Sequence, residues 1–327
     1  MGRSSDRLFP LGVPVSDLQV VFGAGQIGRA LAARLSEIGH PVRTVSLHGS
    51  AAIGVDVDCW TADISDPDAA IGAAKGASVI YQCLGVPYTQ WPKKFPPLQR
   101  NVIGAAQQAG ALLVTLENVY GYGDTGGRTL TEDLPLSATT LKGQARAAMT
   151  VDLLDAEQSG RVRIAIGRAS DFFGPGATQS TLGTRVFGNA LAGKKADFIG
   201  NPDLPHTYSY APDIVAGLVT LGTDKRAVGQ TWHLPGPETL STRALLDIVA
   251  DRVGHAVGIR NVPMVMMRVL GVFSPMMRGL AEMSYEFEQP FVLDTSKFNT
   301  TFGGTPTPLA TAIDDTIAWY RTQGSNR

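Results

Sequence analysis

The chain has 327 residues, a formal net charge of −1 at pH 7, and a composition that is 44% hydrophobic and 17% charged. This length allows one large domain or two modest ones, and the near-neutral charge without a basic run gives no indication of a nucleic-acid partner. No run reaches the roughly 18 apolar residues that a membrane span needs, and residues 1–16 lack the hydrophobic core of a signal peptide.

The stretch from Leu18 to Leu35 contains an apolar run, a glycine-rich turn and a segment with helical spacing. This order predicts a strand, a tight turn and a helix whose N-terminus faces a bound phosphate. In a dinucleotide-binding unit the first glycine permits the turn, the second lets the backbone approach the pyrophosphate, and the third lets the helix pack on the strand. An ordinary glycine turn is the alternative, but the flanking strand and helix favour dinucleotide binding. The residues expected to take part are Gly23, Gly25, Gln26, Ile27 and Gly28.

Strand and helix patterns alternate through the first half of the chain. The predicted strands after the first are 42–47, 55–61, 78–83, 111–116 and 162–167, and the predicted helices are 66–75, 95–109 and 140–158. Asp66 is the expected N-cap of its helix, with Pro67 in the first turn. Alternation of this kind predicts an α/β fold, a Rossmann-type doubly wound parallel sheet with ligands beyond the carboxyl ends of its strands.

After Arg168 the pattern becomes looser. Short strands are predicted near 197–199, 207–210 and 231–234, and helices near 182–192, 212–222 and 241–253. We therefore expect a flexible arm over residues 1–17, a dinucleotide-binding domain over 18–170, and a smaller C-terminal substrate lobe over 171–327. The two larger parts are expected to interleave.

The two cysteines, Cys59 and Cys83, lie in apolar strand-like runs, which predicts buried, reduced thiols and a cytoplasmic protein. Metal-ligand spacing is absent from the histidines at 40, 48, 206, 233 and 255, so no metal site is expected. The expected partner is a small-molecule substrate, and a homodimer is compatible with the sequence.

Several motifs occur in an order that points to a known superfamily. After the glycine turn, in which Phe22 stands where a commoner first glycine would be, they are Thr61-Ala62-Asp63-Ile64, Asn118-Val119-Tyr120-Gly121, Thr131-Glu132-Asp133-Leu134-Pro135, the turn from Arg168 to Gly176, and the segment from Tyr208 to Asp213. From about Leu18 to Tyr320 the chain resembles the extended and atypical short-chain dehydrogenases/reductases, the NAD-dependent epimerase/dehydratase-like group. This resemblance implies a nicotinamide cofactor, with Asp63 reaching the adenine.

The chain departs from that superfamily at the catalytic groups. Its members use a YxxxK pair, in which the tyrosine is the acid/base and the lysine lowers the tyrosine pKa and holds the nicotinamide ribose. Counting from Pro135, Lys142 takes the tyrosine position, Arg146 takes the lysine position, and Leu116 takes the place of the catalytic Ser/Thr. The resemblance therefore implies the fold more firmly than the usual redox mechanism.

Lys142 and Arg146 are spaced to share one helix face. Arg146 is expected to bind the ribose or a phosphate, and Lys142 to relay a proton or form a Schiff base. A solvated basic face is the alternative. Glu117 is a second candidate acid/base, with a turn or capping contact as its alternative, and Tyr120 offers a hydroxyl near the same edge.

Other residues are expected around the substrate and the cofactor. Aromatic rings after the fourth strand can stack on a substrate or pack within their loop. The expected substrate contacts are Tyr88, Trp91, Asn118, Tyr122, Phe172 and Tyr208, and Leu84 is expected at the cofactor.

The segment from Val42 to Ser50 bears on the choice of cofactor. An acidic residue at the end of the second strand favours NAD, because it binds the ribose 2′-hydroxyl. No acid occurs in this segment, while Ser46 and His48 can hold a phosphate and Arg29 can help. The sequence therefore favours NADP, with NAD as the alternative.

The segment from Val262 to Met277 is apolar and rich in methionine. It is interpreted as a core helix of the smaller lobe, with a cap over an apolar substrate pocket or a contact with a membrane surface as alternatives.

Three functions fit these features. The first is an oxidoreductase of the atypical short-chain type, dependent on NAD(P) and acting on a small carbonyl or hydroxyl compound. The second is a dinucleotide-binding regulatory or scaffold protein without catalysis. The third is a non-redox isomerase or lyase that uses Lys142.

Overall fold

The computed structural model describes residues 17–50, 53, 54, 56–262 and 264–324. The segment 1–16, predicted as an arm, and the predicted start of the third strand at residue 55 lie outside the described residues. The core of the fold is a seven-stranded sheet in the order β11-β6-β5-β4-β1-β2-β3. Every pairing in this sheet is parallel, so the predicted Rossmann-type α/β fold is confirmed.

The first six strands lie close to their predicted positions. They are β1 (Leu18–Phe22), β2 (Val42–Ser46), β3 (Val57–Thr61), β4 (Ala77–Gln82), β5 (Leu112–Asn118) and β6 (Arg163–Ala169). The fifth strand continues beyond its predicted end because Glu117 and Asn118 still pair with Arg168 and Ala169 of β6. Because of this extension, Glu117 lies within β5, and its carboxylate contacts Thr150 of α4 (Leu141–Gln158). The turn contact expected for Glu117 is therefore not seen.

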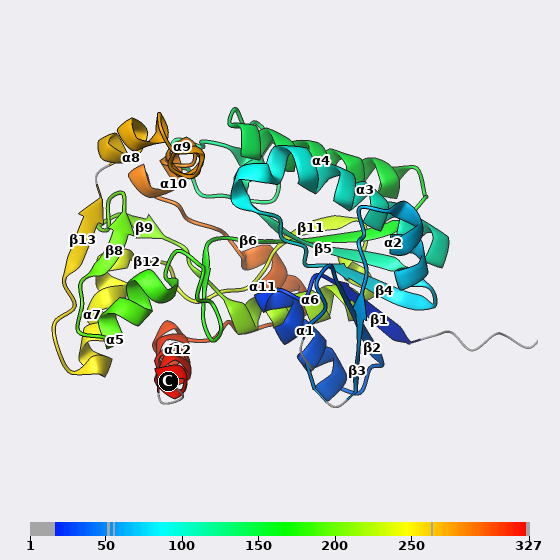
Figure 1. Ribbon diagram of the computed structural model, residues 1–327, viewed down its shortest axis with the longest axis horizontal. Helices are drawn as coiled ribbons and strands as arrows, with labels where there is room; N and C mark the ends of the chain where they lie inside the picture. The colour runs from blue at the N-terminus through cyan, green and yellow to red at the C-terminus, as the bar shows by residue number, and fades with distance from the viewer. Residues whose placement is uncertain (1–16, 51–52, 55, 263, 325–327) are drawn as a thin grey trace, which may run out of the picture.

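Helices cover both faces of the sheet (Figure 1). One face carries α2 (Pro67–Ala74), α3 (Trp91–Ala109) and α4 (Leu141–Gln158), and the other carries α1 (Gln26–Glu37) and α6 (Ala211–Thr223). Two buried clusters correspond to these faces, one built around Val21, Leu31 and Trp232 and the other around Val20, Ile80 and Leu113. The sheet is therefore buried on both sides, as parallel sheets require.

The local sequence explains where these helices begin. Asp66 caps α2, because its side chain accepts from the backbone N–H of Asp68, as expected. Helix α3 begins at Trp91, earlier than predicted, although it contains Pro96 and Pro97. These prolines are tolerated because the carbonyls that lose their partners belong to exposed residues at the start of the helix, where water replaces the missing bonds.

The chain returns to the sheet after residue 170. Strand β11 (Gln230–His233) pairs with β6, and the 3₁₀ turn η4 (Lys225–Ala227) leads into it from α6. The segment 171–327 is therefore divided between the sheet and the smaller lobe. Residues on both sides of position 170 therefore contribute strands to the same sheet, and the chain does not divide there into two separate parts.

The smaller lobe is a third cluster of buried residues around Phe187, Leu246 and Ile313. Its strands are β7 (Phe172–Phe173), β8 (Ala196–Ile199), β9 (Pro205–His206), β10 (Ser209–Tyr210), β12 (Leu240–Ser241) and β13 (Ile259–Val262). Its helices are the π-helical η3 (Gly183–Gly188), α5 (Asn189–Leu191), α7 (Thr242–Val253) and α12 (Leu309–Gly324). Further helices are α8 (Met264–Gly271), α9 (Pro275–Glu282), α10 (Tyr285–Glu288) and α11 (Ser296–Phe302), with short turns η1 (Tyr88–Gln90) and η2 (Tyr120–Tyr122) beside the sheet.

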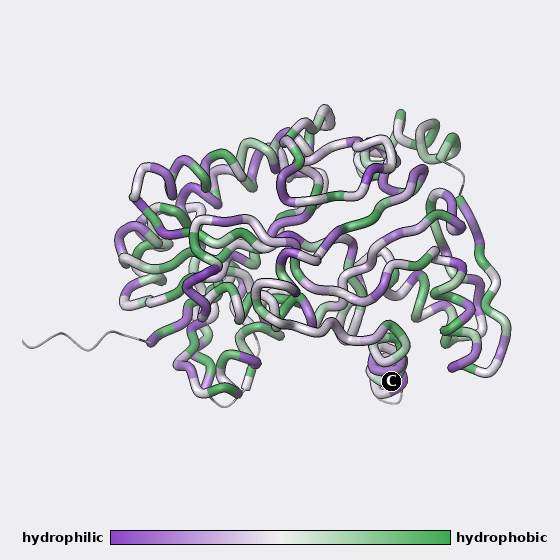
Figure 2. Tube along the Cα trace, turned by 180° about the vertical axis from the view of Figure 1, so that it is seen from behind, coloured by the Kyte–Doolittle hydropathy of each residue, from purple (hydrophilic) through white to green (hydrophobic). Residues whose placement is uncertain are grey.

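The methionine-rich segment forms the α8–α9 hairpin and not a core helix. Met264 and Met267 are buried, but Val265, Val272 and Phe273 are exposed, with 85% of Phe273 accessible. Seen from behind, α8 is coloured hydrophobic along most of its length at the outer end of the molecule (Figure 2). The core-helix interpretation is therefore wrong for most of the segment, because only one side of the hairpin packs on the protein.

None of the helices in the described part of the chain is long and apolar enough to cross a membrane. Cys59 and Cys83 are free, partly buried thiols, and burial raises the pKa of Cys83 to about 12.

His233 ends β11 and is completely buried. Its Nδ1 lies 2.9 Å from the carbonyl of Asp294, which can only accept, so Nδ1 carries the proton and Nε2 accepts from the Tyr122 hydroxyl at 2.7 Å. Burial holds the pKa of the imidazole down at about 4, compared with 6.5 in the unfolded chain.

We predict that the free energy of unfolding falls as the pH drops from about 6.5 to about 4. In this window the unfolded chain binds a proton at His233 and the native protein does not, so acid favours unfolding, by up to about 3 kcal/mol at about 1.4 kcal/mol per pKa unit. Urea unfolding at a series of pH values measures the effect. In His233→Asn this part of the pH dependence should disappear, and an unchanged slope would contradict the assignment.

Candidate functional site

The glycine turn brings β1, α1 and the end of β4 into close contact. Gly23 has a φ of +105°, and a Cβ there would collide with the backbone carbonyl of Cys83. A Cβ on Gly28 would overlap the carbonyl oxygen of Gly23. Gly25 differs, because among the described residues no atom other than those of its chain neighbours lies within 4 Å of the position of its Cβ. Two glycines are thus required by the packing, while the third faces open space.

The N-terminus of α1 is left for an acceptor from outside the chain. Gly25 is its N-cap, and no described side chain caps the helix there. Gln26 is oriented toward the turn at Gly176, where its amide donates to the Gly176 carbonyl at 3.3 Å and accepts from the N–H of Ala177 at 2.9 Å. Ile27 is buried against the sheet. The first-turn N–H groups and the positive end of the helix dipole therefore suit a phosphate.

The ends of β2 and β3 lie on one side of this turn. The hydroxyl oxygen of Ser46 is buried and has no hydrogen-bond partner among the described residues. His48 and Asp63 are exposed, and Asp63 accepts from the N–H of Ser65 at 2.9 Å. Leu84, after β4, is half-buried against the core. This edge therefore presents an unsatisfied hydroxyl together with accessible polar side chains.

Lys142 and Arg146 lie on one face of α4 and are 4% and 6% exposed. The alternative of a solvated basic face is therefore wrong. Thr140 is the N-cap of α4, and its side chain accepts from the N–H of Gly143. The helix that follows this cap presents both cations to the interior of the protein.

Arg146 is buried without an ion-pair partner among the described residues. Its guanidinium stacks on Phe95 and Trp91 at 4.2 and 4.8 Å from the ring centroids, while Nε and Nη1 have no hydrogen-bond partner. Burial lowers the pKa of Arg146 to about 10. A buried cation with two unsatisfied donors is costly, so its geometry fits a polar or anionic group that a bound ligand supplies.

Lys142 is held by α9. Its Nζ lies 2.9 Å from a carboxylate oxygen of Glu282 and 3.3 Å from the carbonyl of Gly279, to which it donates, and 4.4 Å from the centroid of Tyr88. A Cβ on Gly279 would lie 2.8 Å from this amine, so a larger residue there would displace the Lys142 amine from its present position. The prediction that Lys142 faces the nicotinamide remains a prediction, and the contacts seen here attach it to the lobe.

Glu117 is part of a buried ion pair at the end of β5. Its carboxylate lies 3.2 Å from Nε of Arg168 and accepts from the hydroxyl of Thr150 at 2.9 and 3.1 Å. Both charged side chains are at least 95% buried. These contacts satisfy the Glu117 carboxylate, which favours a structural role over acid/base chemistry.

A group of aromatic and acidic side chains gathers where β4, β5 and β6 end. We call Tyr88, Tyr120, Asp171, Tyr285 and Glu286 the tyrosine–carboxyl cluster. The phenol groups of Tyr88 and Tyr120 interact with each other, and burial together with the nearby Glu286 raises the pKa of Tyr120. The cluster therefore brings several proton-bearing groups together, of which Glu286 is buried and the other four are half-buried.

Trp91 connects this cluster to Arg146. Its ring lies 5.4 Å from Tyr88 and 5.8 Å from Tyr120, and its other neighbours are Phe95 and the Arg146 guanidinium. The predicted residues Tyr88, Trp91, Tyr120 and Arg146 are thus brought together by the structure.

Four other predicted substrate residues lie apart or already have partners. Asn118 accepts from the N–H of Tyr120, Tyr122 is bonded to His233, and Tyr208 is bonded to Thr242 in the core of the lobe. Phe172 is half-buried in β7. These contacts favour packing roles for Tyr122 and Tyr208.

The comparison with known families follows from this arrangement. A model of the NAD dependent epimerase/dehydratase family matches residues 20–234, which is more than half of the chain. The chain belongs to the NAD-dependent epimerase/dehydratase family. None of the curated proteins matches the chain in sequence.

Solved structures share the fold of this family member. UDP-glucuronic acid 4-epimerase from Bacillus cereus, solved with UDP-glucuronic acid and NAD, has a TM-score of 0.76 at 17% identity, covering 94% of this chain and 99% of the epimerase. An epimerase from Methanothermobacter thermautotrophicus has a TM-score of 0.79 at 15% identity, covering 95% and 94%. MoeE5, solved with UDP-glucuronic acid and NAD, has a TM-score of 0.76 at 17% identity, covering 93% and 99%. At these identities the likeness establishes the fold alone.

Sequence reasoning about this family member missed three acids: Asp171, Glu282 and Glu286. Asp171 lies inside the motif at 168–176, so its place at the end of β6 offered a signal. Glu282 and Glu286 follow the methionine-rich hairpin, far along the chain from the strands that they approach. No spacing in the sequence predicts that contact.

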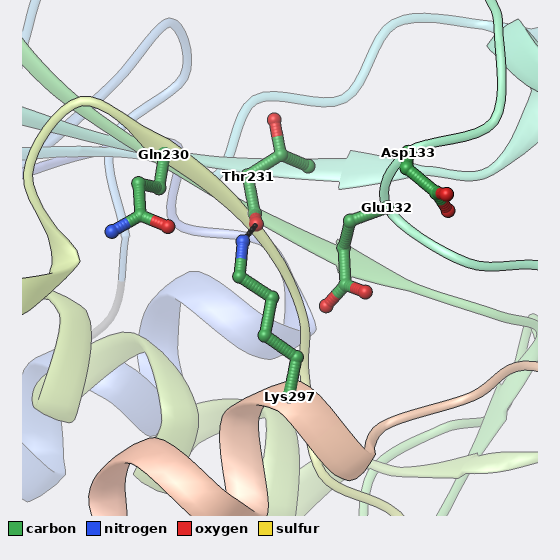
Figure 3. Close-up of a pocket in the computed structure, with 5 residues that line it drawn as sticks. All are labelled: Glu132, Asp133, Gln230, Thr231 and Lys297. Atoms are coloured by element: carbon green, nitrogen blue, oxygen red, sulfur yellow. Dashed lines mark hydrogen bonds between the residues drawn. The ribbon is translucent and has the colours of Figure 1, made fainter.

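A shallow groove of about 480 Å³ lies elsewhere, along the edge strand β11 (Figure 3). Lys297 donates to the carbonyl of Thr231 at 2.8 Å, and Glu132 accepts from the N–H of His233 at 2.9 Å. The groove lies beside β11 at the edge of the sheet, and its lining residues Glu132, Asp133, Gln230, Thr231 and Lys297 are not among those of the candidate site. Its side chains satisfy backbone groups of an edge strand.

We predict that Glu117→Gln lowers the free energy of unfolding by about 3 kcal/mol, because it leaves the charge of Arg168 buried without compensation. Urea unfolding provides the measurement. The double variant Glu117→Gln/Arg168→Met should recover part of the loss, since it removes the stranded charge. A loss of less than about 0.5 kcal/mol in the single variant, typical of a surface substitution, would contradict this account.

Proposed function

We propose that this protein is an NAD(P)-dependent oxidoreductase acting on a small, uncharged carbonyl or hydroxyl compound. The observation that carries the proposal is the glycine turn at the N-terminus of α1, where packing requires Gly23 and Gly28 but leaves Gly25 facing open space. The unsatisfied nitrogens of Arg146 support it from the other end of the site.

These residues divide the binding of a dinucleotide between them. The N–H groups after Gly25 suit the pyrophosphate, and the Ser46 hydroxyl and Asp63 lie beyond the strands on the adenosine side. Arg146 lies on the side of β4 and β5, where it can donate to the nicotinamide ribose. When bound, the dinucleotide supplies or accepts the hydride.

The preference for NADPH over NADH rests on the residues around Ser46. The segment 42–50 contains no acidic residue. In addition, the buried hydroxyl of Ser46 has no hydrogen-bond partner among the described residues. Arg43 is occupied, since it pairs with Asp58 at 3.2 Å and stacks on Trp60 at 3.9 Å. Hydrogen bonds from Ser50 and Thr44 lower the pKa of the Cys59 thiol most, and the positive charge of Arg29 is close enough to lower it further. This positive charge favours a 2′-phosphate.

The charges near the cluster favour an uncharged substrate. Structural relatives were solved with UDP-sugars, which carry a diphosphate. Here Asp171, Glu282 and Glu286 bring negative charge or acidic groups to the cluster, and Lys142, the nearest lysine, is already paired with Glu282. A diphosphate placed beside these acids would be repelled, whereas an uncharged carbonyl compound would pack against the aromatic rings.

Replacement of all three usual catalytic groups supports a second candidate, a dinucleotide-binding protein without catalysis. Hydride transfer from NADPH to an added aldehyde or ketone distinguishes the two. A lyase or isomerase that forms a Schiff base on Lys142 is disfavoured, because that chemistry needs a free amine and the Lys142 amine is paired with Glu282.

We predict that Gly25→Val folds as the parent does but binds NADPH at least tenfold more weakly, which corresponds to about 1.4 kcal/mol. Apart from its chain neighbours, no described residue has an atom within 4 Å of the Cβ position, yet the side chain would stand where the proposed pyrophosphate site lies. Titration calorimetry measures the affinity and thermal unfolding checks the fold. Gly28→Ala is the matched control: it should lower the melting temperature, because its methyl group overlaps Gly23. Equal NADPH affinity in Gly25→Val and the parent would contradict the proposed site.

We predict tighter binding of NADPH than of NADH to the unaltered protein, and a shift toward NADH in Ser46→Asp. The new carboxylate would repel the 2′-phosphate and accept from the 2′-hydroxyl of NADH. Parallel titrations with the two dinucleotides measure the ratio of the affinities. Tighter NADH binding by the parent would overturn the preference while leaving dinucleotide binding intact.

A further inference from the structure

A carboxyl group in the tyrosine–carboxyl cluster has no partner that explains its burial. Glu286 is 2% exposed, and its Oε1 makes no hydrogen bond with any described residue. The groups around it are Tyr88, Tyr120, Tyr285 and Asp171, all of which are acids or phenols. A buried carboxylate without a cation is strongly unfavourable, so this arrangement favours the neutral, proton-bearing acid.

The nearby cations do not change this conclusion. Lys142 forms its ion pair with Glu282, and the Arg146 guanidinium stacks on Trp91 and Phe95. Asp171 accepts from Thr181 at 3.0 Å and lies 3.1 Å from Nε2 of His206. Burial and the negative charge of Asp171 both raise the pKa of Glu286 well above its usual value. The electrostatics therefore agree with the geometry.

The position of the cluster relative to the sheet places Glu286 near the expected site of the nicotinamide. Tyr88 follows β4, Tyr120 follows β5 and Asp171 follows β6, so the cluster lies beyond the carboxyl ends of three adjacent strands. In a doubly wound sheet a dinucleotide crosses the point between β1 and β4 where the strand order reverses. The adenosine half lies toward β2 and the nicotinamide half toward β4 and β5. The neighbours of Glu286 follow β4, β5 and β6, so Glu286 belongs to the nicotinamide side. Helix α10, which carries it, lies next to α8 and α9 (Figure 1).

We propose that Glu286 is the catalytic acid of this protein, in place of the tyrosine that its family motif lacks. This inference rests on the proposed oxidoreductase function. As a hydride reaches the carbonyl carbon and forms the new C–H bond, the electron pair of the C=O π bond moves to oxygen. That oxygen takes the proton from the Glu286 carboxyl group, whose O–H bond breaks. In the reverse direction the Glu286 carboxylate removes the proton from the alcohol.

The charges balance in this step. Glu286 becomes a carboxylate as the oxidised cofactor gains a positive charge, so the two new charges attract each other. In the absence of that positive charge, the neighbouring Asp171 and the phenols favour the return of a proton to Glu286. The same surroundings thus return Glu286 to its protonated form before the next reaction cycle.

The test uses the infrared carbonyl band of a protonated carboxyl group in the full-length protein, measured without substrate. With NADPH bound, the band of Glu286 should be present. With NADP⁺ bound, it should weaken or vanish, because the cationic nicotinamide lowers the pKa of a nearby carboxyl group. Both signals should be absent in Glu286→Gln. No band assignable to Glu286, or an identical band in the two complexes, would overturn the proposal.

Glu132→Gln is the matched control, because burial also raises the pKa of Glu132, but its carboxylate accepts from the N–H of His233 at the edge strand β11 and is not part of the tyrosine–carboxyl cluster. It should leave the cofactor-dependent change intact. Loss of that change in Glu132→Gln would show that the signal does not belong to Glu286. Failure of the parent to bind either dinucleotide, seen separately by calorimetry, would contradict the proposed function itself.

A kinetic test adds a second readout, with benzaldehyde and cyclohexanone as uncharged probes. Glu286→Gln should lower kcat by ~100-fold or more, the usual loss for a proton donor, with little change in NADPH affinity. Glu286→Asp should restore part of the rate, since it keeps the proton but shortens the side chain. In the parent, kcat/KM for reduction should fall as the pH rises through the pKa of Glu286. Parental kcat in Glu286→Gln would overturn the assignment.

Discussion

The close approach of α1 to the end of β1 is the constraint on which the candidate site depends. It exists because Gly28 has no Cβ to collide with the carbonyl of Gly23, and because Gly23, at a φ of +105°, has no Cβ to collide with the carbonyl of Cys83. This contact aims the N-terminus of α1 at the carboxyl edge of the sheet and fixes β4 beside β1. Every other candidate group lies beyond that same edge, so the geometry of the turn sets the reference point for the site.

Buried charges then connect distant parts of the chain around α4. A charge removed from water needs a partner, and each partner here comes from a different element. Glu282 of α9 meets Lys142, while Arg168 of β6 meets Glu117. The first pair ties the lobe to the sheet and the second ties β5 to β6. Arg146 is the exception, because its donors remain unsatisfied within the described chain, and this distinguishes a group prepared for a ligand from groups that hold the fold.

The aromatic and acidic surroundings give the site a chemical character unlike that of its family motif. Burial raises the pKa of both Tyr120 and Tyr88, so neither phenol is prepared to ionise. The carboxyl group of Glu286 begins from a much lower intrinsic pKa, and burial together with Asp171 raises that pKa and favours the protonated form. The same environment therefore keeps the phenols from ionising and keeps a proton on the carboxyl group of Glu286.

The sequence alone determined six of the seven strands of the sheet, because hydrophobic periodicity and glycine, proline and aspartate signals act over a few residues, whereas only the structure placed β11 beside β6. It predicted the strand–turn–helix at 18–35, the cap at Asp66 and the face of α4 that carries Lys142 and Arg146. It could not show that Glu117 would be satisfied by Arg168 and Thr150, or that the methionine-rich segment would leave Phe273 exposed. Those outcomes depend on which surfaces meet. Likewise, only the tertiary structure brought Glu282 and Glu286 to the ends of β4, β5 and β6, because no local pattern encodes a contact between residues so far apart in the chain.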